Sequence, residues 1–118
     1  MEGVITTIGP ATAKVLQVLL SDPGRAWYGR ELIRETGIAS GSMYPLLRRL
    51  EAAGWVISQR EVIDTIAAGR PARTYHHIAP QAVAEVRARL AAEVARYTPP
   101  PATAGEAGMG MQPGITRK

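Results

Sequence analysis

ASGSMYPLLRRLEAAGWV, residues 39–56, is the stretch of this 118-residue chain that decides the fold. Read as a helix, it places an apolar residue at each of the i, i+3, i+4 and i+7 positions of a core-facing stripe, namely Met43, Leu46, Leu47 and Leu50. The face left over carries Ser42, Tyr44, Pro45, Arg48 and Arg49. Its hydroxyl and guanidinium groups suit phosphates and base edges. Taken alone, the stretch fits an ordinary amphipathic helix with a solvated basic edge equally well.

The start of this helix depends on which serine caps it. Ser40 and Ser42 are both good N-caps, because a serine oxygen accepts a hydrogen bond from a free amide of the first turn. With Ser42 as the cap, Pro45 lies in the first turn at no cost, whereas with Ser40 about one hydrogen bond is lost. We expect Gly54 to end the helix, because glycine adopts the left-handed conformation cheaply.

The composition is that of one small globular domain. Hydrophobic residues make up 46% of the chain, and the lack of cysteine excludes disulfides, thiolate metal sites and a thiol nucleophile. The longest apolar run, residues 15–20, is far shorter than the ~20 residues of a membrane span, and the chain begins without a signal-peptide pattern. We therefore expect a cytoplasmic protein without a membrane partner. The net charge of +4, carried almost entirely by arginine, permits a polyanionic partner without requiring one.

Two shorter helices are predicted before residue 39. Residues 11–21, with Pro10 at the start, are apolar on more than one side and end at the turn-forming residues 22–24. A second helix spans about residues 29–36, with Leu32 and Ile33 facing inward. A turn of about four residues containing Gly37 joins it to the next helix, which is the helix-turn-helix pattern. Many helical proteins contain such a pair, so the pattern alone is weak.

A β-hairpin is predicted directly after the helix pair. Residues 55–63 and 73–78 are rich in β-branched and aromatic residues, and residues 64–71 between them are expected to form a turn or loop. A hairpin in this place makes the winged variant of the helix-turn-helix, a far more specific pattern. Arg70 is expected at the tip and Arg73 on the returning strand, where an arginine can enter a narrow minor groove. The alternative is a solvated hairpin whose arginines contact nothing.

The last predicted helix runs from Pro80 to about Tyr97. It presents a narrow apolar seam that needs a partner, formed by Val83, Val86, Leu90, Val94 and Tyr97. The expected partners are the first helix, through Val15 and Leu19, and the same two helices of a second copy. Residues 98–118 are rich in Pro, Gly and Ala, and are expected to be a disordered tail. The chain thus divides into a DNA-binding unit (1–79), a dimerisation helix (80–97) and the tail.

Three motifs in this order resemble the PadR-like family of transcriptional regulators. Residues 40–56 are similar to the family's recognition helix, in which a small-residue cap leads into Tyr-Pro and a Leu-Arg-Arg-Leu-Glu run. Residues 69–78, GRPARTYHHI, are similar to its wing, and residues 28–32, YGREL, to the start of its second helix. The resemblance covers about residues 11–97. The wing departs from the family pattern, because Thr74, His76 and His77 stand where tyrosine or a basic residue is common.

The resemblance implies a mainly α fold with a small β-hairpin and a homodimeric repressor that binds a palindromic operator. Each half-site would take one recognition helix in the major groove and one wing. The DNA-binding residues that we expect on both grounds are Ser40, Ser42, Tyr44, Pro45, Arg48, Arg49, Arg70 and Arg73. Tyr44 can equally be a packed residue with its hydroxyl at the rim. The resemblance also implies a small aromatic effector, for which Trp27, Tyr28, Trp55 and Tyr97 are candidate ligands or, equally, ordinary core residues.

Other classes of function fit the sequence less well. We expect no enzyme, because the carboxylates are scattered and neither a nucleophile elbow nor a phosphate-binding glycine loop is present. No metal is expected, because His76 and His77 are neighbours on a strand and point to opposite faces. The stronger alternative is a winged-helix module for protein interaction or dimerisation that does not read DNA.

Overall fold

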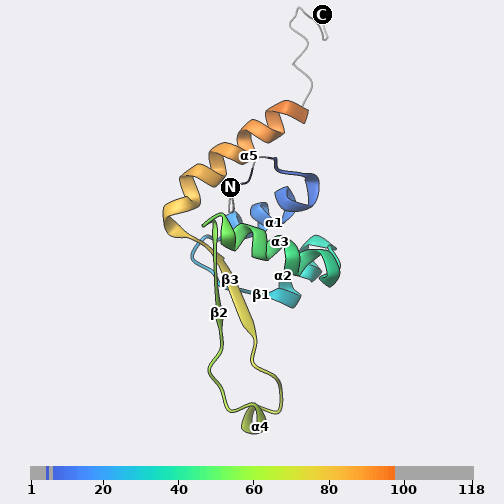
Figure 1. Ribbon diagram of the computed structural model, residues 1–118, viewed down its shortest axis with the longest axis vertical. Helices are drawn as coiled ribbons and strands as arrows, with labels where there is room; N and C mark the ends of the chain where they lie inside the picture. Colours follow the sequence, from blue (N-terminus) through green and yellow to red (C-terminus); the bar gives the residue numbers. More distant parts are fainter. Residues whose placement is uncertain (1–4, 6, 98–118) are drawn as a thin grey trace, which may run out of the picture.

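The computed structural model describes residue 5 and residues 7–97. Along the chain, the elements are α1 (Pro10–Ser21), β1 (Trp27–Tyr28), α2 (Gly29–Thr36), α3 (Ser40–Ala52), β2 (Val56–Arg60), α4 (Thr65–Ala68), β3 (Thr74–Ile78), the 3₁₀ helix η1 (Pro80–Ala82) and α5 (Val83–Tyr97). Figure 1 shows a body of helices from which the β2–β3 hairpin projects, with α4 at its far end and α5 on the opposite side. The molecule is mainly helical with a small antiparallel sheet, as predicted, and has the winged-helix form.

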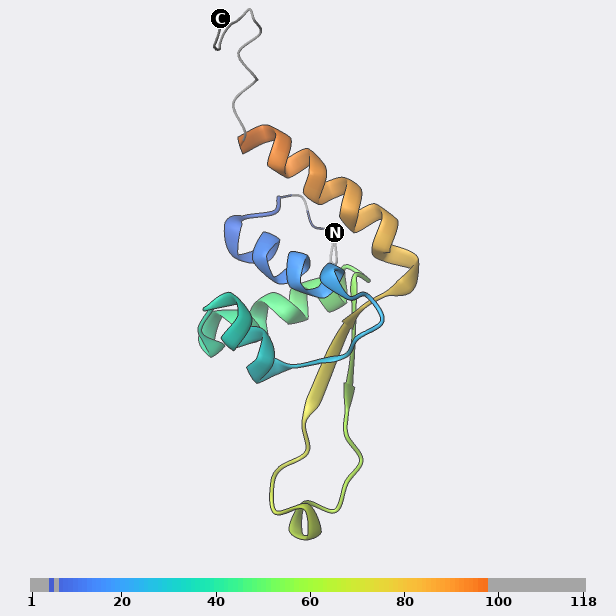
Figure 2. The ribbon, with the colours of Figure 1, turned by 180° about the vertical axis from the view of Figure 1, so that it is seen from behind.

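The core lies between the first three helices and the base of the hairpin. The predicted stripe of α3 is confirmed, because Met43, Leu46, Leu47 and Leu50 are all buried. Helix α1 contributes Val15, Leu16, Leu19 and Leu20, which lie on more than one side of the helix. Two sides are covered because α1 packs against α2 and also lies beneath α5, as Figure 2 shows from behind. Ile8, just before α1, is also wholly buried.

The sheet has three strands in the order β1-β3-β2, both pairs antiparallel. The hairpin was predicted and β1 was not, because two residues are too few to show strand periodicity. In the register, His76 on β3 lies between Trp27 on β1 and Ser58 on β2. As expected for neighbours on a strand, the two histidines differ in burial: His76 is 4% exposed and faces the core, whereas His77 is only partly buried.

Two local predictions were wrong. Neither serine caps α3: the helix begins at Ser40 with Ala39 as N-cap and without a side-chain cap, so Pro45 lies inside the helix. Residues 64–71 do not form a plain loop, because Asp64 accepts hydrogen bonds from the amides of Ile66 and Ala67 and starts the one-turn helix α4. Gly69, with φ of 69°, ends that turn.

The predicted dimerisation seam is largely internal to one chain. Val15, Leu19 and Val86 are wholly buried and Leu90 is 7% exposed, because α5 packs on α1 of the same chain. The expected contact with the first helix is confirmed, whereas the assignment of these four side chains to a surface that a second copy would contact is wrong, because they are buried within one chain. Val83 is half-buried, and Val94, at 52% exposed, is the one clearly exposed member among those whose side chains are described. The Tyr97 side chain and residues 98–118 lie outside the described part.

The N-terminal segment is tied to α5 rather than free along its whole length. The Arg89 guanidinium donates a 2.7 Å hydrogen bond to the backbone oxygen of Ile5 and lies 5.4 Å from the ring centroid of Trp55. Residues 1–4 and 6 lie outside the described part. In the part of the chain that the structure describes, no helix combines the length and the apolar character needed to cross a membrane.

Candidate nucleic-acid interface

The outer face of α3 is open to solvent over the length that the sequence assigned to DNA. Ser40, Ser42, Arg48 and Arg49 are exposed, and Pro45 is half-buried. Arg48 and Arg49 have no hydrogen-bond or ion-pair partner among the described residues. Because arginine presents a planar fork of donors, two free guanidinium groups on one helix face can bind phosphates or base edges.

The first turn of α3 adds backbone donors to this face. Because the helix has no side-chain cap, the amides of Ser40 and Gly41 at its positive end remain available to an anion. A cleft of about 600 Å³ between α2 and α3 lies at this end of the helix and is lined by Arg30, Ile33, Arg34, Ser40 and Tyr44. Sequence reasoning missed Arg30 and Arg34 as site residues. Their i, i+4 spacing on the outer face of α2, just before the turn, is the pattern that could have identified them.

Tyr44 combines the two roles that the sequence left open. Its ring packs on the start of α2 so closely that a Cβ at Gly29 would lie 2.8 Å from the Tyr44 hydroxyl oxygen and 2.9 Å from its Cε1. The side chain nevertheless stays 37% exposed and lines the cleft, while its hydroxyl lies against the start of α2. Position 29 therefore requires glycine if Tyr44 is to lie in this place.

Arg70 is held by an internal contact and does not form the tip of the wing. Its guanidinium donates to both carboxylate oxygens of Glu61, at 2.7 and 3.2 Å, and to the backbone oxygen of Pro71. Glu61 also accepts from the amide of Arg73 at 2.9 Å. These hydrogen bonds, that of Arg70 first, lower the pKa of Glu61 to about 2, and the carboxylate in turn raises the pKa of Arg70. This corrects the prediction of a free arginine at the end of the hairpin.

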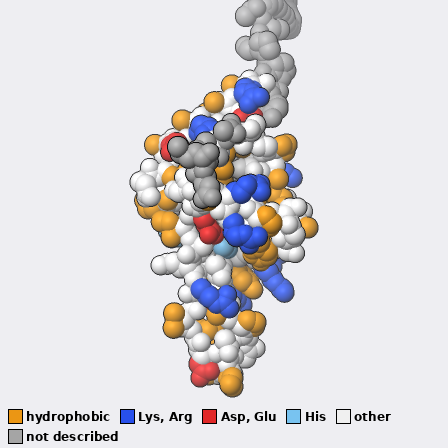
Figure 3. Space-filling model, in the orientation of Figure 1, with side chains coloured by type: hydrophobic (Ala, Val, Ile, Leu, Met, Phe, Trp, Pro, Cys, Tyr) orange, Lys and Arg blue, Asp and Glu red, His pale blue; other side chains and the backbone are white. Residues whose placement is uncertain are grey.

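The wing tip is apolar. Val62 and Ile66 are 101% and 90% exposed, and Ala67 and Ala68 beside them are exposed too. On the face seen in Figure 3, blue lysine and arginine side chains lie in separate patches over the body and the middle of the wing, whereas apolar and acidic side chains are seen at its far end. A tip of this kind has little attraction for phosphates.

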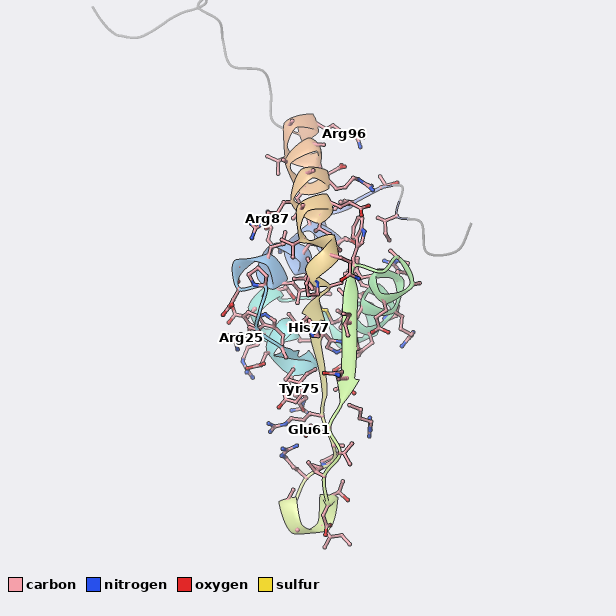
Figure 4. The ribbon with its side chains drawn as sticks, turned by 90° about the vertical axis from the view of Figure 1, so that its left-hand side faces the viewer. Arg25, Glu61, Tyr75, His77, Arg87 and Arg96 are labelled. Atoms are coloured by element: carbon pink, nitrogen blue, oxygen red, sulfur yellow. The ribbon has the colours of Figure 1, made fainter. Side chains whose placement is uncertain are left out.

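The cations near the base of the wing are stacked on aromatic rings. The Arg73 guanidinium lies 4.7 Å from the centroid of Tyr28, whose ring lies 5.9 Å from that of Tyr75. The Arg25 guanidinium lies 3.6 Å from the Trp27 centroid and 3.0 Å from a carboxylate oxygen of Glu31. Figure 4 shows Arg25, Tyr75 and Glu61 following one another from the body toward the hairpin. Stacking fixes the direction of these guanidinium groups. Those N–H groups in their planes that are not already bonded remain available to an anion.

The candidate effector residues lie in different surroundings. Trp27 is buried at 6% exposure and lines a cleft of about 400 Å³ with Lys14, Gln17 and Thr36. Trp55 is buried at 3% exposure, and Tyr28 stacks with Tyr75. Among the described residues, no three His, Asp or Glu side chains are grouped closely enough to bind a metal ion.

The fold is shared with a known structure. The chain is similar to the crystal structure of the "putative transcriptional regulator TA0346 from Thermoplasma acidophilum", with 28% sequence identity and a TM-score of 0.51 over 73% of this chain and 81% of that chain. No protein-family model and no curated protein sequence matches the chain. This structural similarity supports the fold of a transcriptional regulator in general. The resemblance of three sequence motifs to PadR-like proteins is a separate observation.

Proposed function

We propose that this protein is a transcriptional regulator that binds double-stranded DNA in a sequence-specific manner, as a homodimeric, cytoplasmic repressor of the PadR-like type. The observation that carries the proposal is the open face of α3, which has an uncapped start at Ser40 and, toward its other end, Arg48 and Arg49 without partners among the described residues. The similarity to a protein described as a transcriptional regulator is consistent with it.

Each residue of the face takes a role that its geometry allows. Arg48 and Ser42 face the bases of the major groove, and Tyr44 and Pro45 shape the contact beside them. Arg49, Arg30 and Arg34 neutralise phosphates, and the first amides of α3, around Ser40, bind one phosphate oxygen. At the wing, Arg73 contacts the backbone from its place on Tyr28. Arg70 acts as a brace that shapes the wing through Glu61.

The proposed dimer forms through the side of α5 and α1 that one chain leaves open. A cleft of about 210 Å³ there is almost wholly apolar, with Pro10, Ala13, Leu90 and Val94 among its lining residues. Val94 is the exposed apolar side chain at its edge. Pairing two copies at this place would present two α3 helices to a duplex, which is why we expect a palindromic operator with half-sites about one helical turn apart.

Selection of bound duplexes from a random pool tests the proposal. We expect enrichment of a palindrome, and we expect the selected duplex to bind more tightly than a scrambled one at the same salt concentration. A pool that yields no common sequence, together with a monomer in sedimentation at the same protein concentration, would contradict the proposal.

A second candidate function is protein interaction without specific DNA reading, and the apolar wing tip favours it. Val62 and Ile66 offer a surface that suits an apolar partner better than a groove lined with phosphates. The same selection separates the two, because an interaction module would enrich no sequence. A small aromatic effector near Trp27 is a further proposal. It predicts quenching of tryptophan fluorescence by planar aromatic compounds, and no response across a broad panel would contradict it.

A further inference from the structure

We propose that Glu51, Ser58 and His76 form a positioning device, a set of hydrogen bonds that fixes α3, the proposed recognition helix, relative to the wing. We further propose that protonation of His76 breaks these hydrogen bonds and lets the two elements move relative to each other. This inference rests on the proposed function for its consequence in DNA binding. The device itself is independent of DNA. It joins three elements: Glu51 is in the last turn of α3, Ser58 is on β2, and His76 is on β3.

The three side chains form one hydrogen-bonded chain. The Ser58 hydroxyl donates to a carboxylate oxygen of Glu51 at 2.5 Å, and Ser58 Oγ lies 2.6 Å from His76 Nδ1. His76 Nδ1 is itself 3.9 Å from the same Glu51 oxygen. These three side chains lie at the corner between the end of α3 and the start of the hairpin. At the same corner, the backbone amide of Trp55 donates a hydrogen bond to the backbone oxygen of Leu50.

The order of donors along the chain determines the tautomer of His76. An ionised carboxylate can only accept, so the single hydroxyl proton of Ser58 goes to Glu51. Ser58 Oγ then accepts from His76, which places the ring proton on Nδ1 and leaves a lone pair on Nε2. Nε2 is buried and has no hydrogen-bond partner among the described residues. A second proton there would create a buried N–H without an acceptor.

The surroundings of the ring oppose a positive charge. The core-facing residues of α1 and α2 are uncharged, and the neighbours of His76 in the register are Trp27 and Ser58. Arg60, further along the same side of β2, is exposed. Among the described residues, Glu51 is the carboxylate that acts on the ring, and its side chain is 37% exposed. Burial lowers the pKa of His76 below 6.5, although Glu51 partly opposes the shift.

Protonation therefore has a structural consequence at the corner. A cationic ring attracts Glu51 directly and competes with Ser58 for it, while its new N–H needs an acceptor. Both changes favour a displacement of the end of α3 or of the base of the hairpin. Arg48 lies on α3 and Arg73 lies beside β3, so such a displacement would alter the spacing between the two DNA contacts.

The chain supplies a matched control, because its two histidines are adjacent on β3 and differ in burial (Figure 4 labels His77). In His77→Gln, His76 is the one side chain left that normally titrates between pH 5 and 8. We expect the affinity of this variant for its selected duplex to fall roughly fivefold or more between pH 7.5 and 5.0. The double variant His76→Gln, His77→Gln should lose that pH dependence, and Ser58→Ala should bind more weakly already at pH 7.5.

Nitrogen-15 NMR of the free protein tests the device without DNA. We expect the Nδ1–H tautomer of His76 at pH 7.5, titration below 6.5, and a changed angle between α3 and the hairpin in residual dipolar couplings at pH 5.0. A proton on Nε2 at pH 7.5, or an angle unchanged after His76 has titrated, would overturn the inference. If these results appear and no duplex is bound at any pH, the proposed function fails and the device stands. If DNA is bound with equal pH dependence in the single and double variants, the device fails and the function stands.

Discussion

The arginines of α3 and those of the wing differ in whether their guanidinium groups already contact other side chains. Arg48 and Arg49 point to solvent without partners in the described part of the chain, whereas Arg70 is held by Glu61 and Arg73 by the ring of Tyr28. A free arginine can give all of its donors to a ligand, a stacked one keeps its N–H groups but is fixed in direction, and Arg70 would first have to break its ion pair. The difference indicates that recognition is concentrated on the helix, and that the wing supports it by shape.

The largest effect on DNA binding is expected from a substitution that prevents dimerisation, because the helix and the wing of both copies then no longer bind one duplex together. Val94→Asp places a carboxylate at the exposed edge of the α1–α5 cleft, so it should prevent pairing of two copies while the core of each stays intact. Sedimentation should show a monomer, and binding to a two-half-site duplex should be lost. Ala84→Asp, also exposed on α5 but not lining this cleft, adds the same single charge and is the control. A dimer that persists in Val94→Asp would contradict this placement of the interface.

Arg48→Ala tests the helix side of the comparison. We expect a loss of about 1–3 kcal/mol in specific binding and a relaxed base preference, because a base-edge contact is removed. Arg49→Ala should instead weaken specific and nonspecific binding alike. Titrations with the selected duplex and a scrambled one, at several salt concentrations, measure both. Equal losses for the two duplexes in Arg48→Ala would contradict its role.

Arg70→Ala tests the wing side, and a smaller effect on DNA binding is expected. Removing the brace raises the pKa of Glu61 toward 4.5, because its main hydrogen bond is lost. A carboxylate with a lowered pKa in the folded state stabilises the protein above pH 4.5, and that stability disappears as the pH falls toward 2. Urea unfolding should therefore show a steeper loss between pH 4.5 and 3 in the wild type than in Arg70→Ala. If the slope of the logarithm of DNA affinity against the logarithm of salt concentration becomes smaller by about one in Arg70→Ala, Arg70 does contact a phosphate.

The smallest effect is expected at the tip. Ile66→Ser changes a side chain that is 90% exposed, so stability should change by less than about 0.5 kcal/mol, and DNA affinity should not change. Thermal unfolding and the duplex titration measure these. A loss of affinity comparable to that of Arg48→Ala would mean that the tip enters the DNA.

The sequence predicted those features that depend on local periodicity. The bounds of α2 and the buried stripe of α3 agree with the structure, because apolar spacing along a helix directly determines which face is buried. The start of α3 was missed because the cap preference of a serine does not show whether its side chain makes the capping hydrogen bond, and α4 was missed because a single turn has no period.

Features that depend on contacts between distant residues could not be predicted. Glu61 and Arg70 are nine positions apart, and Ser58 and His76 eighteen, so their pairing follows from the register of the hairpin. The contact between the first and the last helix was expected, but not that it buries Val86 and Leu90 within one chain. A helix seam in a sequence does not reveal whether its partner belongs to the same chain.

The ion pair between Glu61 and Arg70, the brace described above, joins the two sides of the hairpin just before its tip. Within the tip, Asp64 and Gly69 begin and end α4, and its outer side chains are exposed to solvent. Residues 62–69 should therefore be exchangeable as a cassette: an epitope tag or a fluorophore attachment site inserted there would leave the helical body undisturbed.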